Sequence, residues 1–157
     1  MDAQGARTGA TTGLAPTGIR IGLTATEAHI RAALATLRRA LAGRGLGPTD
    51  CDTTELVLAE ALNNIAEHAY GGQRPGPVQL ALRTGRGGIT ASLRDRGRPM
   101  PGNRMPEPGP PAIGVRREAM PEGGFGWFLI RDLTTARRYR RVRGENRLTL
   151  CIPRTGR

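Results

Sequence analysis

The chain has 157 residues and 24 basic side chains, all of them arginine, against 13 acidic ones, which gives a net charge of +11. The absence of lysine excludes a phosphate-binding loop that depends on lysine, a Schiff-base lysine and a lysine general base. Any bound phosphate must therefore be held by arginine, backbone N–H groups or a metal ion. The arginine excess reflects either the coding bias of the genome or a nucleic acid or acidic protein as partner.

The length fits one domain with a real hydrophobic core. The two cysteines, Cys51 and Cys151, lack the spacing of a metal site, and no apolar run approaches the roughly 20 residues of a membrane span. We therefore expect a cytoplasmic protein that makes no contact with a membrane. We expect a single domain over residues 17–153, with flexible tails at 1–16 and 154–157.

The first half of the chain predicts a strand and two helices. Apolar residues alternate from Ile19 to Leu23, which is typical of a half-buried strand. Thr24 and Glu27 have the spacing of a capping box, which predicts a helix from there to the glycines at 43–47. A second helix is predicted from Asp50 or Asp52 to Tyr70, with a buried stripe of Leu58, Ala61, Leu62, Ile65 and Ala69.

The second half predicts strands around 78–82 and 89–95, a proline-rich loop over 99–124, a helix from 127 to 134, and strands at 136–142 and 148–152. A loop of this length inside a compact domain is usually functional and is often a lid. The grouped order of the elements favours an α+β fold, a two-layer α/β sandwich. We expect a mixed, mostly antiparallel sheet with helices on one face.

A polar stripe marks the second predicted helix. Glu60, Asn64 and His68 are spaced four apart, and Asn63 and Glu67 lie beside them on the same helical face. The stripe is either a solvated face or a site, and two adjacent asparagines cost helix stability without a structural return. A carboxylate one turn from a carboxamide can hold Mg²⁺, which in turn favours phosphates.

Two glycine motifs frame the predicted lid. Asp95 and Gly97 end a strand, where a carboxylate can accept a hydrogen bond from an exocyclic amine and glycine lets a flat ring approach. The segment 123–126, Gly-Gly-Phe-Gly, precedes a helix, so its N–H groups can face an anion. Each motif alone is also an ordinary turn. Together they bracket one loop, which favours a nucleotide site.

These motifs resemble the GHKL ATPase superfamily. Residues 60–68, EALNNIAEH, look like its N box, DRG at 95–97 its G1 box, and GGFGWFLI at 123–130 its G2 box. Within the superfamily the chain most resembles the anti-sigma factor serine/threonine kinases of the RsbW and SpoIIAB type. The resemblance covers about residues 17–153 and implies the Bergerat fold with an ATP lid.

The resemblance also implies roles for individual residues. Glu60 would orient or deprotonate the attacking hydroxyl as the catalytic residue, and Asn64 would be the Mg²⁺ ligand, with Asn63 as an alternative. The remaining ATP contacts implied by the family motifs are His68, Asp95, Gly97, Gly123, Gly124, Phe125, Gly126 and Thr149. Thr149 would close the adenine pocket. ATP and Mg²⁺ are thus the expected cofactors.

The lid departs from the family pattern. Pro99 stands where a second glycine is common, and no lysine is available for the γ-phosphate. That contact falls to Arg104, Arg116 or Arg117, whose forked side chains suit phosphate oxygens.

The resemblance implies a Mg-ATP-dependent kinase that phosphorylates a STAS-type antagonist and otherwise sequesters a sigma factor. The alternative is a partner-switching module that binds ATP but transfers no phosphate. A histidine kinase is disfavoured because no helix pair carrying a phosphoacceptor precedes the domain. The arginines of 137–147 suggest a nucleic-acid binder, but the run holds no known binding motif, so we expect no direct nucleic-acid contact. A homodimer, formed through the sheet or the first helix, is expected from the subgroup.

Overall fold

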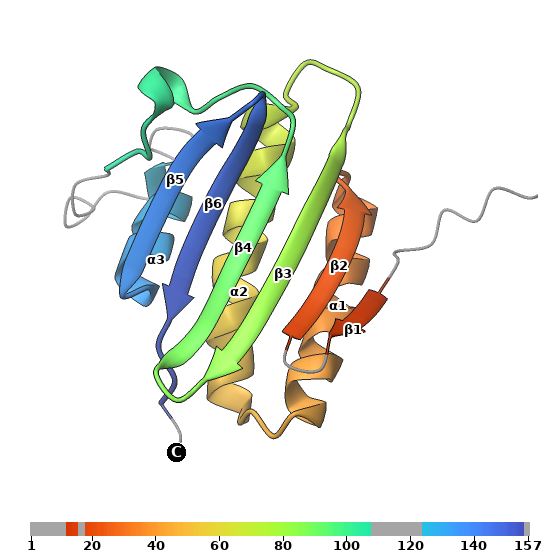
Figure 1. Cartoon of the computed structure of the whole chain (residues 1–157), viewed down its shortest axis with the longest axis vertical. Coiled ribbons are helices and arrows are strands. Elements are labelled where there is room, and N and C mark those ends of the chain that lie inside the picture. The colour runs from red at the N-terminus through yellow and green to blue at the C-terminus, as the bar shows by residue number, and fades with distance from the viewer. Residues whose placement is uncertain (1–11, 16–17, 108–123, 156–157) are drawn as a thin grey trace, which may run out of the picture.

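The structure is a computed structural model, and it describes residues 12–15, 18–107 and 124–155. They form two layers, a six-stranded sheet and a layer of three helices on one of its faces (Figure 1). The elements in chain order are β1 Thr12–Ala15, β2 Gly18–Thr24, α1 Glu27–Gly43, α2 Pro48–Asn64, the π-helical turn η1 Ile65–Ala69, β3 Pro77–Gly85, β4 Gly88–Asp95, the 3₁₀ turn η2 Pro101–Asn103, α3 Gly124–Leu133, β5 Ala136–Val142 and β6 Glu145–Ile152. The expected two-layer α/β sandwich is confirmed.

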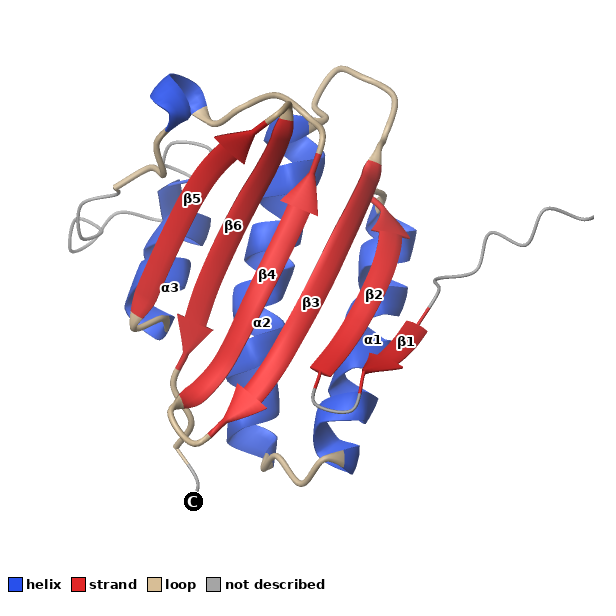
Figure 2. Cartoon of the chain, viewed as in Figure 1, coloured by secondary structure: helices blue, strands red, loops and turns tan. Residues whose placement is uncertain are grey.

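The strand order is β1-β2-β3-β4-β6-β5, and every neighbouring pair is antiparallel (Figure 2). The sheet of the described residues is thus antiparallel throughout, where a mixed sheet was expected. Side chains alternate between faces along each strand. One face buries the aliphatic residues Ile19, Ile21, Leu80, Leu82, Ile89, Leu93, Leu148 and Leu150 against the helices.

The first helix begins two residues later than the capping-box spacing predicts. Its N-cap is Thr26, whose Oγ1 accepts a hydrogen bond from the N–H of His29 at 3.2 Å. Thr24 instead ends β2, where it pairs with Pro77. Thr24 is therefore part of the pairing between β2 and β3 and does not cap the helix as the local pattern predicts.

The second helix begins earlier than predicted, because Gly47 is its N-cap and Pro48 takes the first position, where proline costs no hydrogen bond. Asp50 is buried in the first turn, and its Oδ1 accepts bonds from the N–H and the hydroxyl of Thr155 at 2.9 and 2.8 Å. Thr155 belongs to the segment 154–157, which was expected to be a flexible tail. In the structure Thr155 is bound to the start of α2.

Part of the predicted organisation lies outside the described residues. The lid is described only up to residue 107, and its remaining residues, 108–123, lie outside. Within the expected N-terminal tail, Thr12–Ala15 forms β1 at the edge of the sheet. No helix of the described segments combines the length and the apolar character needed to span a membrane.

Candidate functional site

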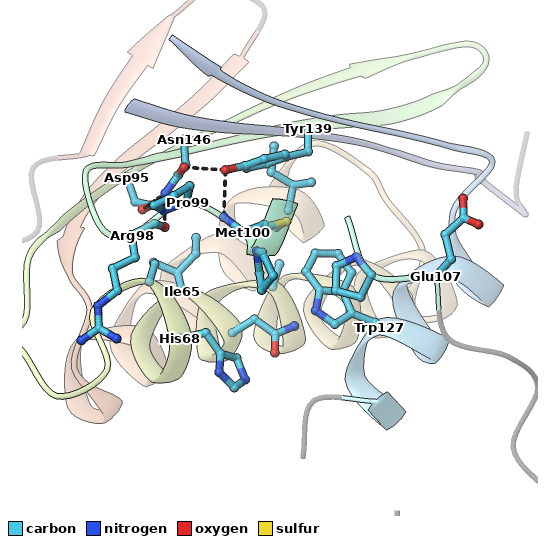
Figure 3. A pocket seen from close by; sticks show the side chains of 16 residues that line it. Ile65, His68, Asp95, Arg98, Pro99, Met100, Glu107, Trp127, Tyr139 and Asn146 are labelled. Carbon is cyan, nitrogen blue, oxygen red and sulfur yellow. Dashed lines mark hydrogen bonds between the residues drawn. The ribbon is translucent and has the colours of Figure 1, made fainter. Parts of the chain in front are cut away.

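A cavity of about 570 Å³ opens between α2, the sheet and the loop after β4 (Figure 3). This volume lies in the range of sites that bind small molecules and cofactors. Helical residues, the β4–η2 loop and the strands β5 and β6 all contribute to its walls. Its lining residues are Ala61, Asn64, Ile65, His68, Ala69, Asp95, Arg98, Pro99, Met100, Pro101, Pro106, Glu107, Trp127, Tyr139, Asn146 and Leu148.

Asp95 is the buried carboxylate of this cavity. Its Oδ1 accepts the N–H of Gly97 at 2.9 Å and Nδ2–H of Asn146 at 2.8 Å. Burial raises the pKa of the Asp95 carboxyl above its ordinary value, and the two hydrogen bonds act in the opposite direction. Its second oxygen, Oδ2, makes no hydrogen bond with the described residues. It is therefore available to a ligand that donates a hydrogen bond.

Asn146 is a site residue that the sequence reasoning missed. Its Nδ2 donates to Asp95 and to the carbonyl of Arg98, and its Oδ1 accepts from the hydroxyl of Tyr139 at 2.7 Å and from Nη1 of Arg141 at 2.8 Å. All four hydrogen-bonding sites of the carboxamide are thus used. Asn146 fixes Asp95 in place and joins it to β5.

The expectation for Thr149 is wrong. Strand side chains alternate, and in β6 the residues Asn146 and Leu148 face the cavity while Thr149 lies on the opposite face, beside Ser92 and Arg138. The alternation of Leu148 and Leu150 in the sequence already places Asn146 on the core face. Strand periodicity was therefore the signal that pointed to Asn146.

Tyr139 and Arg141 hold the segment that leads from β4 into the lid. The hydroxyl of Tyr139 accepts the N–H of Met100 at 3.0 Å (Figure 3). Nη1 of Arg141 donates to the carbonyl of Gly97 at 2.9 Å. Gly97 does not line the cavity. A Cβ at this position would lie 2.5 Å from the carbonyl oxygen of Ala69, so glycine is required for close packing on η1 instead of for contact with a ring.

Glu60, Asn64 and Gly126 come together where α2 meets α3. A Cβ at Gly126 would lie 2.6 Å from Oε2 of Glu60 and 3.8 Å from Nδ2 of Asn64. Nδ2 of Asn64 is buried and has no hydrogen-bond partner among the described residues. A buried amide nitrogen without a partner is costly, and it leaves a donor that a ligand could satisfy. The structure thus brings the N-box pair of the sequence analysis against the glycine segment.

The other predicted site residues divide into three groups. His68 is exposed and lines the cavity, where its ring points away from the Asp95 end (Figure 3). Arg104 and Phe125 do not line it, and Trp127 is the aromatic residue of α3 that does. Gly124 is the first residue of α3. The residues Gly123, Arg116 and Arg117 lie outside the described residues.

Only part of the polar stripe on the second helix lines the cavity. Asn63 and Glu67 are exposed and take no part in the cavity. Below Asn64 the α-helix passes into η1, where Tyr70 N–H donates to the carbonyl of Ile65. A π-helical turn inserts an extra residue and is frequent at functional sites. Here it lies under the cavity and carries His68.

Comparison with known proteins agrees with this geometry. The model of the histidine kinase-like ATPase domain matches residues 23–152. The chain is 35% identical over 98 residues to the serine/threonine-protein kinase BtrW of Bordetella bronchiseptica, an alignment that covers 62% of this chain and 67% of BtrW.

The fold also matches a solved structure, that of the RsbU and RsbW domains of Rv1364c from Mycobacterium tuberculosis. The TM-score is 0.58 at 24% identity, over 87% of this chain and 32% of the other, so this chain spans about a third of that protein. This likeness concerns the fold. The family match over residues 23–152 agrees with the placement of Asn64 and Asp95 in the wall of one cavity, and it shows that the chain belongs to the family of histidine kinase-like ATPase domains.

Proposed function

We propose that the chain is a Mg-ATP-dependent protein serine/threonine kinase of the anti-sigma factor type. It transfers the γ-phosphoryl group of ATP to a serine of a STAS-type antagonist and otherwise binds a sigma factor. The observation that carries this proposal is the meeting of Glu60 and Asn64 with Gly126 beside a cavity of nucleotide size. Membership in an ATPase family and the relative named as a serine/threonine kinase support it.

The cavity offers one end for the adenine and one for the phosphates. Oδ2 of Asp95 would accept a hydrogen bond from the adenine amino group, while Ile65 and Leu148 offer apolar surface to the ring. The phosphates would lie toward the N-terminal end of α3. There the N–H groups near Gly124 and Gly126 and the positive end of the helix favour an anion.

Asn64 fits the magnesium ion that the family implies. Its buried, unpartnered Nδ2 could donate to a phosphate oxygen, and the oxygen of the same amide is the kind of ligand that Mg²⁺ prefers. The described residues hold no cluster of three or more His, Cys, Asp or Glu. Asn64 would therefore share the ion with phosphate oxygens and water, and the ion would neutralise phosphate charge when bound.

Glu60 would act on the substrate hydroxyl. Its carboxylate accepts the proton as the serine oxygen forms a bond to the γ-phosphorus, while the bond from that phosphorus to the bridging oxygen breaks and ADP leaves. The close approach of Gly126 to Glu60 supports this role, because it would leave the carboxylate beside the start of α3, the end proposed for the phosphates. Positioning of this kind is the main contribution that a protein makes to phosphoryl transfer.

The test is phosphate transfer from γ-labelled ATP to a purified STAS-domain antagonist. We expect Glu60→Gln to lower the transfer rate by about 10²-fold or more, the lower limit of the range for general-base removal, while ATP affinity changes little. Glu67→Gln is the matched control, because Glu67 is exposed on the same helical segment and does not line the cavity. Equal rates in wild type and Glu60→Gln would contradict the kinase mechanism. Partner binding that responds to ATP without any transfer would identify the non-catalytic switch.

A further inference from the structure

The face of the sheet turned away from the helices carries a set of arginine side chains. The three helices of the described chain lie behind the sheet, and no described element covers its front (Figure 1). Because the aliphatic residues of β2, β3, β4 and β6 point to the helices, the residues between them point outward. The outward positions hold Arg20, Arg83, Arg94, Arg138, Arg140 and Arg147. We call this surface the arginine face.

Three of these arginines stand in one row across neighbouring strands. Arg140 pairs in register with Arg147, and Arg147 with Arg94. Like charges directly opposite each other destabilise a sheet. Glu145 offsets part of this cost, because its Oε1 lies 2.8 Å from Nε of Arg147 and 4.0 Å from Nη1 of Arg94. Arg140 has no such partner among the described residues.

Four arginines of this face have no partner among the described residues. Arg20, Arg83, Arg138 and Arg140 make no ion pair or side-chain hydrogen bond there. Glu145 is the one acidic side chain at an outward position of the described strands. The other acids of the described chain lie in the helix layer or beside the cavity. The charge of the arginine face is thus largely uncompensated within the chain.

The structure separates this face from the neighbouring basic residues of the same sequence run. Arg137 donates to Thr134, and Arg141 to Asn146 and the loop after β4, so both are engaged on the helix side of the sheet. Tyr139, the aromatic residue of β5, also points into the cavity. The arginine face therefore lacks the aromatic platform on which single-stranded nucleic acids stack.

The floor between the arginines is made of small side chains. Ala81, Ser92 and Thr149 form one row that separates Arg20 from Arg138. Leu56, on α2, is the exposed large apolar residue of the described chain, so the arginine face holds no apolar patch. Such a surface binds through charge and through the forked hydrogen bonds of guanidinium groups to carboxylates.

We propose that the arginine face docks an acidic protein surface. It lies on the opposite side of the sheet from the ATP cavity, so a partner bound here leaves the cavity open. The same charge opposes pairing of two copies through this face, because like charges would then meet. A homodimer would have to use another surface, such as α1 or the edge at β1.

The test uses charge-matched triple variants. The face variant is Arg20→Gln, Arg138→Gln and Arg140→Gln. The control is Arg31→Gln, Arg39→Gln and Arg74→Gln, three exposed arginines away from this face. Fluorescence anisotropy measures binding of a labelled polyglutamate of about 20 residues, and of a random DNA duplex of about 20 base pairs, near physiological salt. ATP is absent, so the result does not depend on the proposed kinase activity.

We expect the face variant to bind polyglutamate about tenfold more weakly than wild type, as three exposed ion pairs predict, and the control to stay within about twofold. Equal weakening in both variants would overturn the proposal, because net charge alone would then explain binding. Duplex binding that exceeds polyglutamate binding and falls in the face variant would assign the surface to nucleic acid instead. Titration of the wild-type protein with polyglutamate should also change the NMR chemical shifts of backbone amides in β5 and β6, and this measurement needs no variant.

Discussion

Gly126→Ala tests whether close contact between α3 and α2 holds the carboxylate of Glu60. The new Cβ would lie 2.6 Å from Oε2 of Glu60, about 0.8 Å short of the 3.4 Å at which ordinary contact begins. The atom in the way ends a flexible side chain, so Glu60 can move aside with little cost to the fold. Alanine in a helix is also favoured over glycine by about 1 kcal/mol. Stability should therefore change by no more than about 1 kcal/mol in either direction.

Phosphate transfer should respond far more strongly than stability. A displacement of nearly 1 Å in a reacting group can cost about 10²-fold in rate. The assay compares transfer from labelled ATP with the melting temperature of the same protein. Gly43→Ala is the matched control, since Gly43 also lies in a helix and a Cβ there meets nothing within 4 Å. A Gly126→Ala protein that melts as wild type does and transfers phosphate at the wild-type rate would refute the reasoning.

Three further changes probe the cavity. Burial raises the pKa of the Asp95 carboxyl, so the folded state loses stability as the pH rises from about 4, the ordinary carboxyl value, to the raised pKa. The melting temperature of Asp95→Asn should therefore rise relative to that of wild type as the pH increases over that range. A constant difference in melting temperature between the two proteins would contradict the burial argument. Tyr139→Phe removes the hydrogen bonds to Asn146 and Met100 and should lower the free energy of unfolding, measured with denaturant, by about 1–2 kcal/mol. Hydrogen exchange at the Met100 amide should become faster, and unchanged exchange there would show that Tyr139 does not hold the lid segment. Asn146→Ala should weaken ATP binding about tenfold in calorimetry while Thr149→Val leaves it within about twofold, and the reverse ranking would restore Thr149 to the cavity.

Local patterns predicted most of the elements of the fold. Residue spacing alone identified the strand around Ile21, the two long helices and the buried stripe from Leu58 to Ala69. These predictions succeed because the period of apolar residues reflects a single buried face. The predicted starts of the two helices were less accurate. Thr24 pairs with β3 instead of capping the first helix, and Gly47, the N-cap of the second, has no side chain that could signal a cap.

The candidate site was predicted in part. Glu60 and Asn64 could be paired from the sequence because they share one helical face, and Asp95 because it ends a strand before a glycine. Their contact with Gly126 could not, because it joins segments about 60 residues apart. Asn146 could not be recognised as the partner of Asp95 either, since it lies 51 residues away on a strand that enters the sheet out of chain order.

The sequence by itself determined the family of the fold, and its lack of lysine means that arginine or histidine must make any contact from a basic side chain to a phosphate. Only the tertiary structure decided which polar groups meet. Antiparallel pairing of β4 with β6 and of β6 with β5 sets Asp95, Asn146 and Tyr139 in one hydrogen-bonded chain and sends Arg138 and Arg140 to the other face. The physical reason is the register, because a shift of one residue would exchange the two faces of every strand.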